Sequence, residues 1–262
     1  MTSRMLDVIL PAGGRLNGAF ADEAGVSIKA LIRIGGQTVL ERTVATLRAT
    51  GIVDRIVVVG PSELALHPAT RGADAVLPDG DCGPDNILRG IDWLEAQGGA
   101  SLRVIVVTTD LPFLTADAVR AFVEACPPSG EICVPILRCE AFTERFPDSP
   151  ATFAPLADGQ WTMACGFLLD PNAVRRNHLR IRQVFAARKS EFTMARLLGP
   201  LFVLRYLTRR LRVEDIERRC TAILRCRGVA VRNARPEMAA DIDTVEDYRY
   251  AVTHADQFHL RR

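Results

Sequence analysis

Short apolar segments alternate with helical patterns along most of this chain, and that alternation limits the fold more than any other feature. Chains of this kind form a mostly parallel sheet whose connections are helices. The strands that we predict span 5–10, 55–59, 73–77, 103–108, 132–136 and 164–169. The predicted helices span 38–50, 85–96, 115–126 and 245–254. We therefore expect a Rossmann-like α/β fold, with a mostly parallel sheet and helices on both faces.

The length of 262 residues fits a single α/β domain, and an apolar content of 48% argues against disorder. The seven cysteines form no C-x-x-C pair, which favours reduced thiols in a cytoplasmic protein. We expect no signal peptide in 1–10, because this stretch lacks a long apolar region. The longest apolar run, 197–204, is far shorter than the roughly 20 residues that span a bilayer.

The first predicted strand leads into a glycine turn, which reads Leu10, Pro11, Ala12, Gly13 and Gly14. Glycines after a strand let backbone N–H groups converge on one point, and such a turn binds phosphate. Arg15 follows the turn and Lys29 lies a short loop further on, so both are placed to add positive charge. The turn therefore predicts a triphosphate site at the end of this strand.

Two acidic segments are candidates for binding a metal ion. Asp110 lies just past the end of the predicted strand 103–108, and an unpaired carboxylate in the core would be costly. Asp243 lies in a short polar stretch before the last predicted helix, two residues after Asp241. Mg²⁺ prefers carboxylates together with phosphate oxygens. We predict Asp110 and Asp243 as ligands and leave open whether Asp241 replaces Asp243; the alternative is that these residues or Thr244 cap helices.

The order of these segments resembles one enzyme family. The segments are 10–14, 29–31, 35–40, 109–113 and 241–244. Together they look like the nucleotidyltransferases of the molybdenum-cofactor type, which are similar to the cytidylyl- and sugar-phosphate nucleotidylyltransferases. The resemblance covers about 1–170 and 236–255. In such a family the glycine turn binds phosphates, and the usual loop has its arginine four residues beyond the glycine, whereas Arg15 follows Gly14 directly.

The resemblance implies a chemistry and roles for individual residues. A nucleoside monophosphate moves from an NTP to a phosphorylated acceptor, and pyrophosphate is released. Lys29 and Arg15 would act on the triphosphate, and Asp110 would bind Mg²⁺. Asp85 and Asn86, in the loop that the resemblance places beside the base and ribose, could contact the nucleotide or cap a helix. Thr162 and Gly166 correspond to a segment that faces the acceptor, although 161–166 is equally compatible with an ordinary strand.

A basic segment interrupts the alternation. The segment 175–232 holds sixteen basic and four acidic side chains, whereas the whole chain has a net charge of +2. We expect 175–228 to be a helical insertion on a single domain that spans 1–262, with helices at 183–187, 193–208 and 213–225. Three uses stay open for 194–212: a lid over an anionic acceptor, a helix on an anionic membrane surface, or a contact in a homo-oligomer. Aromatic platforms for nucleic acid are absent.

Taken together, the sequence predicts a Mg²⁺-dependent nucleotidyltransferase acting on a small acceptor such as a pterin cofactor or a sugar or polyol phosphate. The alternative within enzymes is a nucleotide-sugar glycosyltransferase. That class normally carries Asp-x-Asp after the nucleotide site, where this chain has Thr108, Thr109 and Asp110. An alternative from another class is a regulatory protein that binds a nucleotide without turning it over.

Overall fold

The computed structural model describes residues 5–188 and 190–256. Its strands are β1 (Leu6–Pro11), β2 (Arg33–Ile34), β3 (Gln37–Thr38), β4 (Val53–Gly60), β5 (Ala75–Pro78), β6 (Val104–Val107), β7 (Ile132–Arg138), β8 (Ala154–Leu156), β9 (Gly159–Met163), β10 (Gly166–Leu169) and β11 (Gly228–Val231). Its α-helices are α1 (Gly18–Ala24), α2 (Val39–Ala49), α3 (Gly83–Ala96), α4 (Ala116–Ala125), α5 (Cys139–Arg145), α6 (Pro171–Ala187), α7 (Glu191–Leu198), α8 (Pro200–Leu207), α9 (Val213–Leu224) and α10 (Val245–Thr253). Short 3₁₀ helices include η1 (Lys29–Leu31), η2 (Ser62–Leu64) and η4 (Pro236–Met238).

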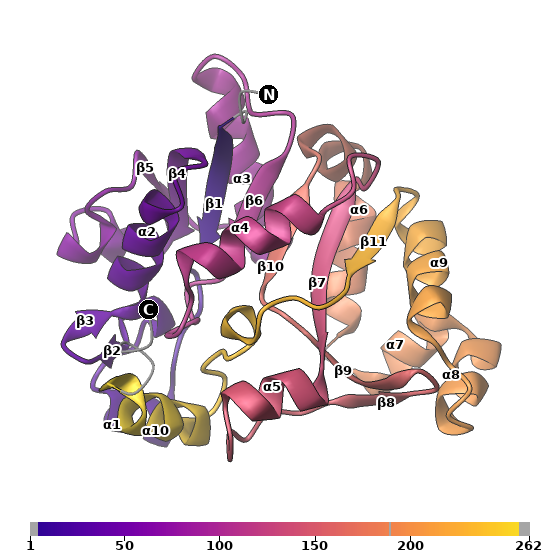
Figure 1. The fold of residues 1–262 in the computed structure, drawn as a ribbon. Helices are drawn as coiled ribbons and strands as arrows, with labels where there is room; N and C mark the ends of the chain where they lie inside the picture. The colour runs from indigo at the N-terminus through magenta and orange to yellow at the C-terminus, as the bar shows by residue number, and fades with distance from the viewer. Residues whose placement is uncertain (1–4, 189, 257–262) are drawn as a thin grey trace.

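The main sheet has nine strands in the order β5-β4-β1-β6-β10-β7-β9-β8, with β11 beside β7 (Figure 1). β1 lies parallel to both β4 and β6, and Val8 is opposite Ile56 on one side and Ile105 on the other. β10 runs antiparallel between β6 and β7. The predicted α/β class with a mostly parallel sheet is therefore confirmed, and the antiparallel strands of the main sheet belong to the second half of the chain.

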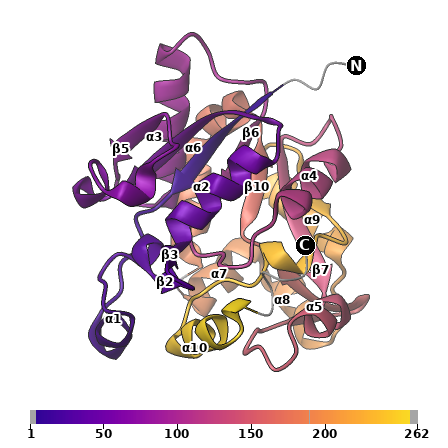
Figure 2. The same cartoon turned by 60° about the vertical axis from the view of Figure 1, so that its left-hand side comes forward.

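Helices cover both faces of this sheet, as the two views show (Figures 1 and 2). Val8 and Leu10 of β1 face the core under α2 and α4, whereas Ile9 faces the core under α3 and α6. Because successive strand residues point to opposite faces, a strand buried on both faces must be apolar throughout. The unbroken apolar run of β1 in the sequence follows from that position.

The predicted elements of the alternating part agree with the structure to within two residues at every boundary. The prediction of one helix over 193–208 is wrong. Gly199 has a φ of 92° and is followed by Pro200, so the chain turns there and forms the separate helices α7 and α8. Among the described residues, no helix has the length and apolar content that crossing a bilayer requires.

Candidate active site

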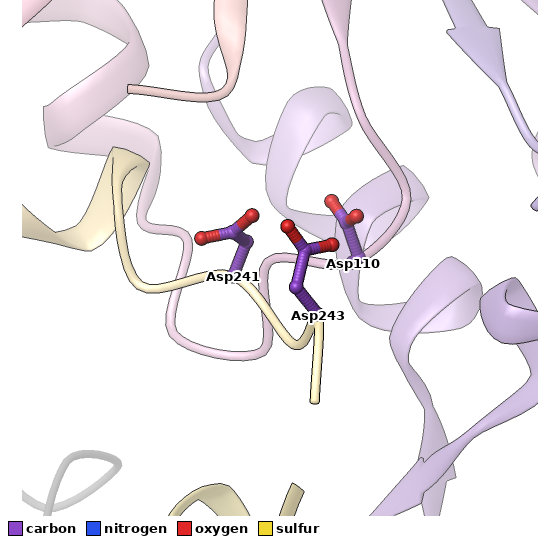
Figure 3. A group of neighbouring side chains, drawn as sticks. All are labelled: Asp110, Asp241 and Asp243. Carbon is purple, nitrogen blue, oxygen red and sulfur yellow. The ribbon is translucent and has the colours of Figure 1, made fainter. Parts of the chain in front are cut away.

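Three aspartates from two distant segments lie side by side at the carboxyl end of the parallel strands (Figure 3). Asp110 follows β6, and Asp241 and Asp243 lie between η4 and α10. One carboxylate oxygen of each residue lies within 4.8 Å of the others. This brings together Asp110 and Asp243, which the sequence nominated, with Asp241, which it left open.

The backbone holds the two segments together. The N–H of Ile242 donates a hydrogen bond to the carbonyl oxygen of Asp110 at 3.0 Å. Ile242 is buried in the core, and the residues on either side of it extend toward Asp110. Directly afterwards, Thr244 and Asp247 form a capping box that starts α10. The loop is therefore fixed at both ends. Thr244, not Asp243, caps α10, and Thr115, not Asp110, caps α4.

Lys29 is the cation of this cluster. Its Nζ donates to Asp110 Oδ2 at 2.6 Å and to Asp243 Oδ1 at 2.5 Å. The Lys29 and Asp110 side chains are 16% and 15% exposed, whereas that of Asp243 is 70% exposed. Burial works against the charge of Lys29, but the carboxylates of Asp110 and then Asp243 outweigh it, so the pKa of Lys29 is raised. The lysine is charged and oriented toward the acidic cluster.

The glycine turn packs directly against this lysine. The backbone N–H of Lys29 donates to the carbonyl oxygen of Gly14 at 2.9 Å. A Cβ on Gly14 would lie 3.3 Å from the Lys29 Cβ, and one on Gly13 would lie 3.1 Å from Asn86 Nδ2 and 3.2 Å from Asp79 Oδ2. Any side chain at these two positions would press on residues of the site. The glycines therefore let the turn approach Lys29, Asn86 and Asp79 closely.

The donor set of the cluster fits a hard divalent cation. All three candidate ligands are carboxylates, which Mg²⁺ and similar ions prefer. Asp110 Oδ1 is buried and has no hydrogen-bond partner among the described residues. Burial, with the added repulsion of Asp110 and Asp243, raises the pKa of Asp241 to about 6. An unsatisfied buried oxygen and crowded carboxylates are both features that a bound cation would relieve.

Asp85 and Asn86 stand at the first turn of α3, which begins at Gly83 after Cys82. His178 Nε2 lies 3.0 Å from Asp85 Oδ1, and Arg182 Nη1 forms an ion pair with Asp85 Oδ2 at 3.1 Å; both residues belong to α6. Asn86 Oδ1 accepts from the N–H of Gly80 at 2.7 Å. Neither side chain makes a side-chain cap at the start of α3, so that alternative is wrong. Asn86 stands beside Gly13, while Asp85 is tied to α6.

The remaining nominated residues lie around the cluster in different settings. Leu10 and Ala12 are buried in the core, and Pro11 ends β1. The exposed Arg15 pairs with Glu63 of η2 at 3.4 Å.

The two residues expected at the acceptor lie in strands. Thr162 lies in β9 opposite Leu137. Gly166 lies in β10, where a Cβ would come 2.9 Å from Met238 Cε. The fold thus gives Gly166 a packing reason to be glycine, and Thr162 is a half-buried strand residue.

Two residues near the site were not among the site residues that the sequence nominated. Asp79 directly follows β5, and Asp110 lies three residues beyond the end of β6, so the rule that placed Asp110 at the carboxyl ends of the strands also applies to Asp79. Cys165 contacts Asp241, and burial together with the charges of Asp241 and Asp110 raises the pKa of its thiol. Its position became visible only once β10 and η4 were placed, because the Cys165 N–H donates to the carbonyl oxygen of Met238.

Comparison with known proteins agrees with this geometry. The MobA-like NTP transferase domain matches residues 10–191, which include the glycine turn, Lys29 and Asp110. The chain belongs to the MobA-like NTP transferase family. The predicted family is thereby confirmed.

Two individual proteins are similar to this chain at more than 30% sequence identity. A phosphoenolpyruvate guanylyltransferase of Sphaerobacter thermophilus is 33% identical over 99 residues, which are 37% of this chain and 47% of that protein. The chain thus matches about half the length of this curated relative. A transferase of Thermus thermophilus, described only as hypothetical, is 31% identical with a TM-score of 0.80, covering 93% of this chain and 99% of the other.

More distant structures share the fold alone. A 2-C-methyl-D-erythritol 4-phosphate cytidylyltransferase, also of Thermus thermophilus, is 19% identical with a TM-score of 0.55, covering 96% of this chain and 99% of the other. The likeness to the hypothetical transferase of Thermus thermophilus thus covers more of the chain than the residues 10–191 that the family model matches.

Proposed function

We propose that this member of the MobA-like family transfers a nucleoside monophosphate from an NTP to a small phosphorylated acceptor and releases pyrophosphate. The observation that carries the proposal is the convergence of Lys29 with Asp110, Asp241 and Asp243 next to the turn at Gly13 and Gly14. Cations and N–H groups suit phosphates, and carboxylates suit a metal ion, so the cluster has both parts that this transfer needs.

In this proposal the turn and Lys29 hold the triphosphate. The N–H groups near Gly13 and Gly14 point at phosphate oxygens, and Lys29 exchanges its carboxylate partners for phosphate when the nucleotide enters. Arg15 is exposed and held by a single exposed partner, Glu63, so it is free to turn toward the phosphates. Side-chain positioning and charge supply most of the rate acceleration in phosphoryl-type transfers.

Asp110, Asp241 and Asp243 would hold the divalent cation, for which we propose Mg²⁺. When bound, such an ion supplies positive charge to phosphate oxygens. The unsatisfied Oδ1 of Asp110 and the raised pKa of Asp241 support this assignment. The exposed Asp243 leaves one side of the cluster open to substrate.

The proposed reaction is a single displacement. An oxygen of the acceptor phosphate forms a bond to the α-phosphorus, and the bond from that phosphorus to the bridging oxygen of the β-phosphate breaks. The acceptor phosphate is already ionised at neutral pH, so no general base is required. Lys29 and the turn stabilise the charge that gathers on the departing pyrophosphate.

We propose GTP as the nucleotide. The guanylyltransferase relative supports this, and so does the carboxylate of Asp79 beside Gly13, because a carboxylate can accept from the N–H donors of guanine. Asn86 adds an amide at the same place. The acceptor candidates remain a pterin cofactor and a sugar or polyol phosphate, to which the relative's name adds phosphoenolpyruvate. Thr162 and Gly166 stay our proposed acceptor contacts.

Three broader expectations complete the proposal. We propose one domain over 1–262 with 175–228 as its helical insertion, in the cytoplasm and without a nucleic-acid partner. A homo-oligomer stays open. The similarity over nearly the full chain to the hypothetical transferase of Thermus thermophilus supports a single domain.

The test is a matrix of pyrophosphate-release assays with Mg²⁺, the four NTPs and a panel of phosphorylated acceptors, followed by mass spectrometry of the product. We expect release only when GTP and one acceptor are both present, and a product that carries the acceptor plus GMP. Tight nucleotide binding with no release under any pair would contradict the proposal and favour a regulatory binding protein. Asp110→Asn serves as the blank.

A further inference from the structure

Helices α7 and α8 expose a concentration of large apolar side chains. Of the eleven large hydrophobic residues that are exposed in the described chain, five lie between residues 192 and 207. They are Phe192, Leu201, Leu204, Tyr206 and Leu207. We call the exposed surface of residues 192–212 the α7–α8 face. Scattered exposed leucines are ordinary, but a contiguous apolar patch marks an interaction surface.

The turn at Gly199 folds the two helices toward each other. Between them lies an open groove of about 480 Å³, lined by apolar side chains including Phe192, Leu204 and Leu207. Arg196 is the charged side chain of its lining. The groove presents apolar atoms to whatever docks there, with positive charge at its margin.

The charged side chains of residues 192–212 all have one sign. The segment 192–212 contains five arginines and neither aspartate nor glutamate. Arg205 pairs with Asp215 of α9 at 3.2 Å. Arg196, Arg209 and Arg210 are exposed, and no ion pair with another described residue holds them. The face therefore combines an apolar centre with cationic side chains that are free to bind anions.

Charge decides between the candidate occupants. A second copy docking through the same face about a two-fold axis would bring arginines against arginines, and such like-charge contacts are costly. An anionic bilayer has the complementary sign, and its acyl-chain boundary accepts leucine and phenylalanine side chains. The two helices have eight residues each, which suits lying in the plane of the interface and not crossing it.

We propose that the α7–α8 face binds the surface of an anionic lipid bilayer. Phe192, Leu204 and Leu207 enter the boundary between head groups and acyl chains, and Arg209 and Arg210 contact lipid phosphates. In Figure 1 α7 and α8 lie at the lower right of the molecule, and α10 lies at the lower left. None of the residues of this face belongs to the acidic cluster or the glycine turn, so binding is separable from the proposed chemistry.

The test is co-sedimentation of the full chain with vesicles of phosphatidylcholine alone or with phosphatidylglycerol, at low and high salt. We expect at least about tenfold stronger binding to the anionic vesicles, lost at high salt. Leu204→Glu with Leu207→Glu, and separately Arg209→Glu with Arg210→Glu, should each lower that binding at least about tenfold. Leu66→Glu with Leu102→Glu is the matched control, because those leucines are exposed elsewhere.

Three results would overturn the proposal. The first is equal or absent binding to the two kinds of vesicle. The second is vesicle binding that the leucine pair and the control pair reduce alike. The third is a dimer, seen by light scattering, that the leucine pair dissociates while vesicles are not bound; this would assign the face to a second copy. Pyrophosphate release in solution is measured on every variant and does not depend on vesicles, so failure of the proposed function would be seen separately.

Discussion

The acidic cluster and the α7–α8 face both contain several charged side chains, but they differ in how these are paired. Lys29 of the cluster forms ion pairs, whereas Arg209 and Arg210 of the face form none with another described residue. In the cluster the half-buried Lys29 pairs with Asp110 and Asp243, and a backbone hydrogen bond from Ile242 joins the two acidic segments. On the α7–α8 face, Arg209 and Arg210 extend into solvent. The difference teaches that charges fixed by internal partners form a preorganised site, whereas unpaired charges around apolar side chains form a surface for an external partner.

A carboxylate outside both regions helps to calibrate this comparison. Asp7 is fully buried, yet each of its oxygens has a partner: Arg55 donates to Oδ1 and Oδ2 at 2.8 Å, and the N–H of Ser101 donates to Oδ2 at 2.7 Å. Asp110, in contrast, keeps Oδ1 without a partner among the described residues. A satisfied buried carboxylate is structural, and an unsatisfied one at a strand end is a candidate for binding a ligand.

The largest effect is expected at Asp110. Asp110→Asn keeps the shape of the side chain but removes the charge that the cation and Lys29 require, so kcat should fall by about 10³-fold or more. The melting temperature should change little. Asp117→Asn is the matched control, because Asp117 is 74% exposed on α4. Steady-state pyrophosphate release checks both, and near wild-type turnover of Asp110→Asn would refute the assigned role.

Lys29→Met should have the next largest effect. It removes the cation of the cluster while keeping the length of the side chain, so kcat/KM for the NTP should fall by about 10²–10³-fold. Arg33→Met, at an exposed position shortly after η1, should leave kcat/KM unchanged. Nucleotide titration and initial rates measure kcat/KM for both variants. An equal loss of kcat/KM in Lys29→Met and Arg33→Met would contradict the special role of Lys29.

Asp7→Asn should have the opposite effect to the two preceding variants, because it should lower stability and leave activity unchanged. Burial works against the charge of Asp7, but the hydrogen bonds from Arg55 and Ser101 outweigh it and lower its pKa. Removing the charge should lower the free energy of unfolding by about 2–4 kcal/mol. Urea unfolding measures this, and kcat at 25 °C serves as the control that should not change.

The lowered pKa of Asp7 also predicts how the stability of the wild type and of Asp7→Asn depends on pH. Because the pKa of Asp7 is lower when folded, its stabilising contribution is complete above its unfolded pKa of about 3.9 and is lost as the pH falls through the folded value. Between about pH 5 and pH 3 the wild type should therefore lose more stability than Asp7→Asn. If the urea unfolding midpoints of the two proteins fall by the same amount across this pH range, Asp7 is not the group that causes the loss of stability.

The smallest effect on stability is expected on the α7–α8 face. Leu204 and Leu207 are 57% and 73% exposed, so replacing both by Glu should change the free energy of unfolding by no more than about 0.5 kcal/mol each. Thermal unfolding without lipid measures this. A drop of several kcal/mol would mean that these leucines belong to the core, which would remove the contrast between the two regions.

Much of the fold could be predicted from the sequence because the strands around β1 are buried on both faces. Their runs of valine and isoleucine are compatible with few structures other than a buried strand. β8 and β9 were not predicted, because these strands are short, mixed in character and partly exposed. The break at Gly199 was overlooked although Gly followed by Pro is a recognisable helix boundary.

The site was predictable where it depends on strand ends and less so where it depends on tertiary contacts. Asp110 follows a strand, and its place at the carboxyl edge follows from the topology. That Asp241 and Asp243 both meet it depends on the hydrogen bond from Ile242 to Asp110, which no local pattern reveals. Likewise the pairing of Arg15 with Glu63 joins two loops that only the folded sheet brings together.

The most direct measurement is pyrophosphate release in solution by three proteins under identical conditions: wild type, Asp110→Asn, and Leu204→Glu with Leu207→Glu. The central claim is that the chemistry belongs to the acidic cluster and not to the α7–α8 face. It predicts full activity in the leucine variant and loss of about 10³-fold in the aspartate variant. If the wild type releases pyrophosphate and Asp110→Asn retains that activity, the claim is contradicted.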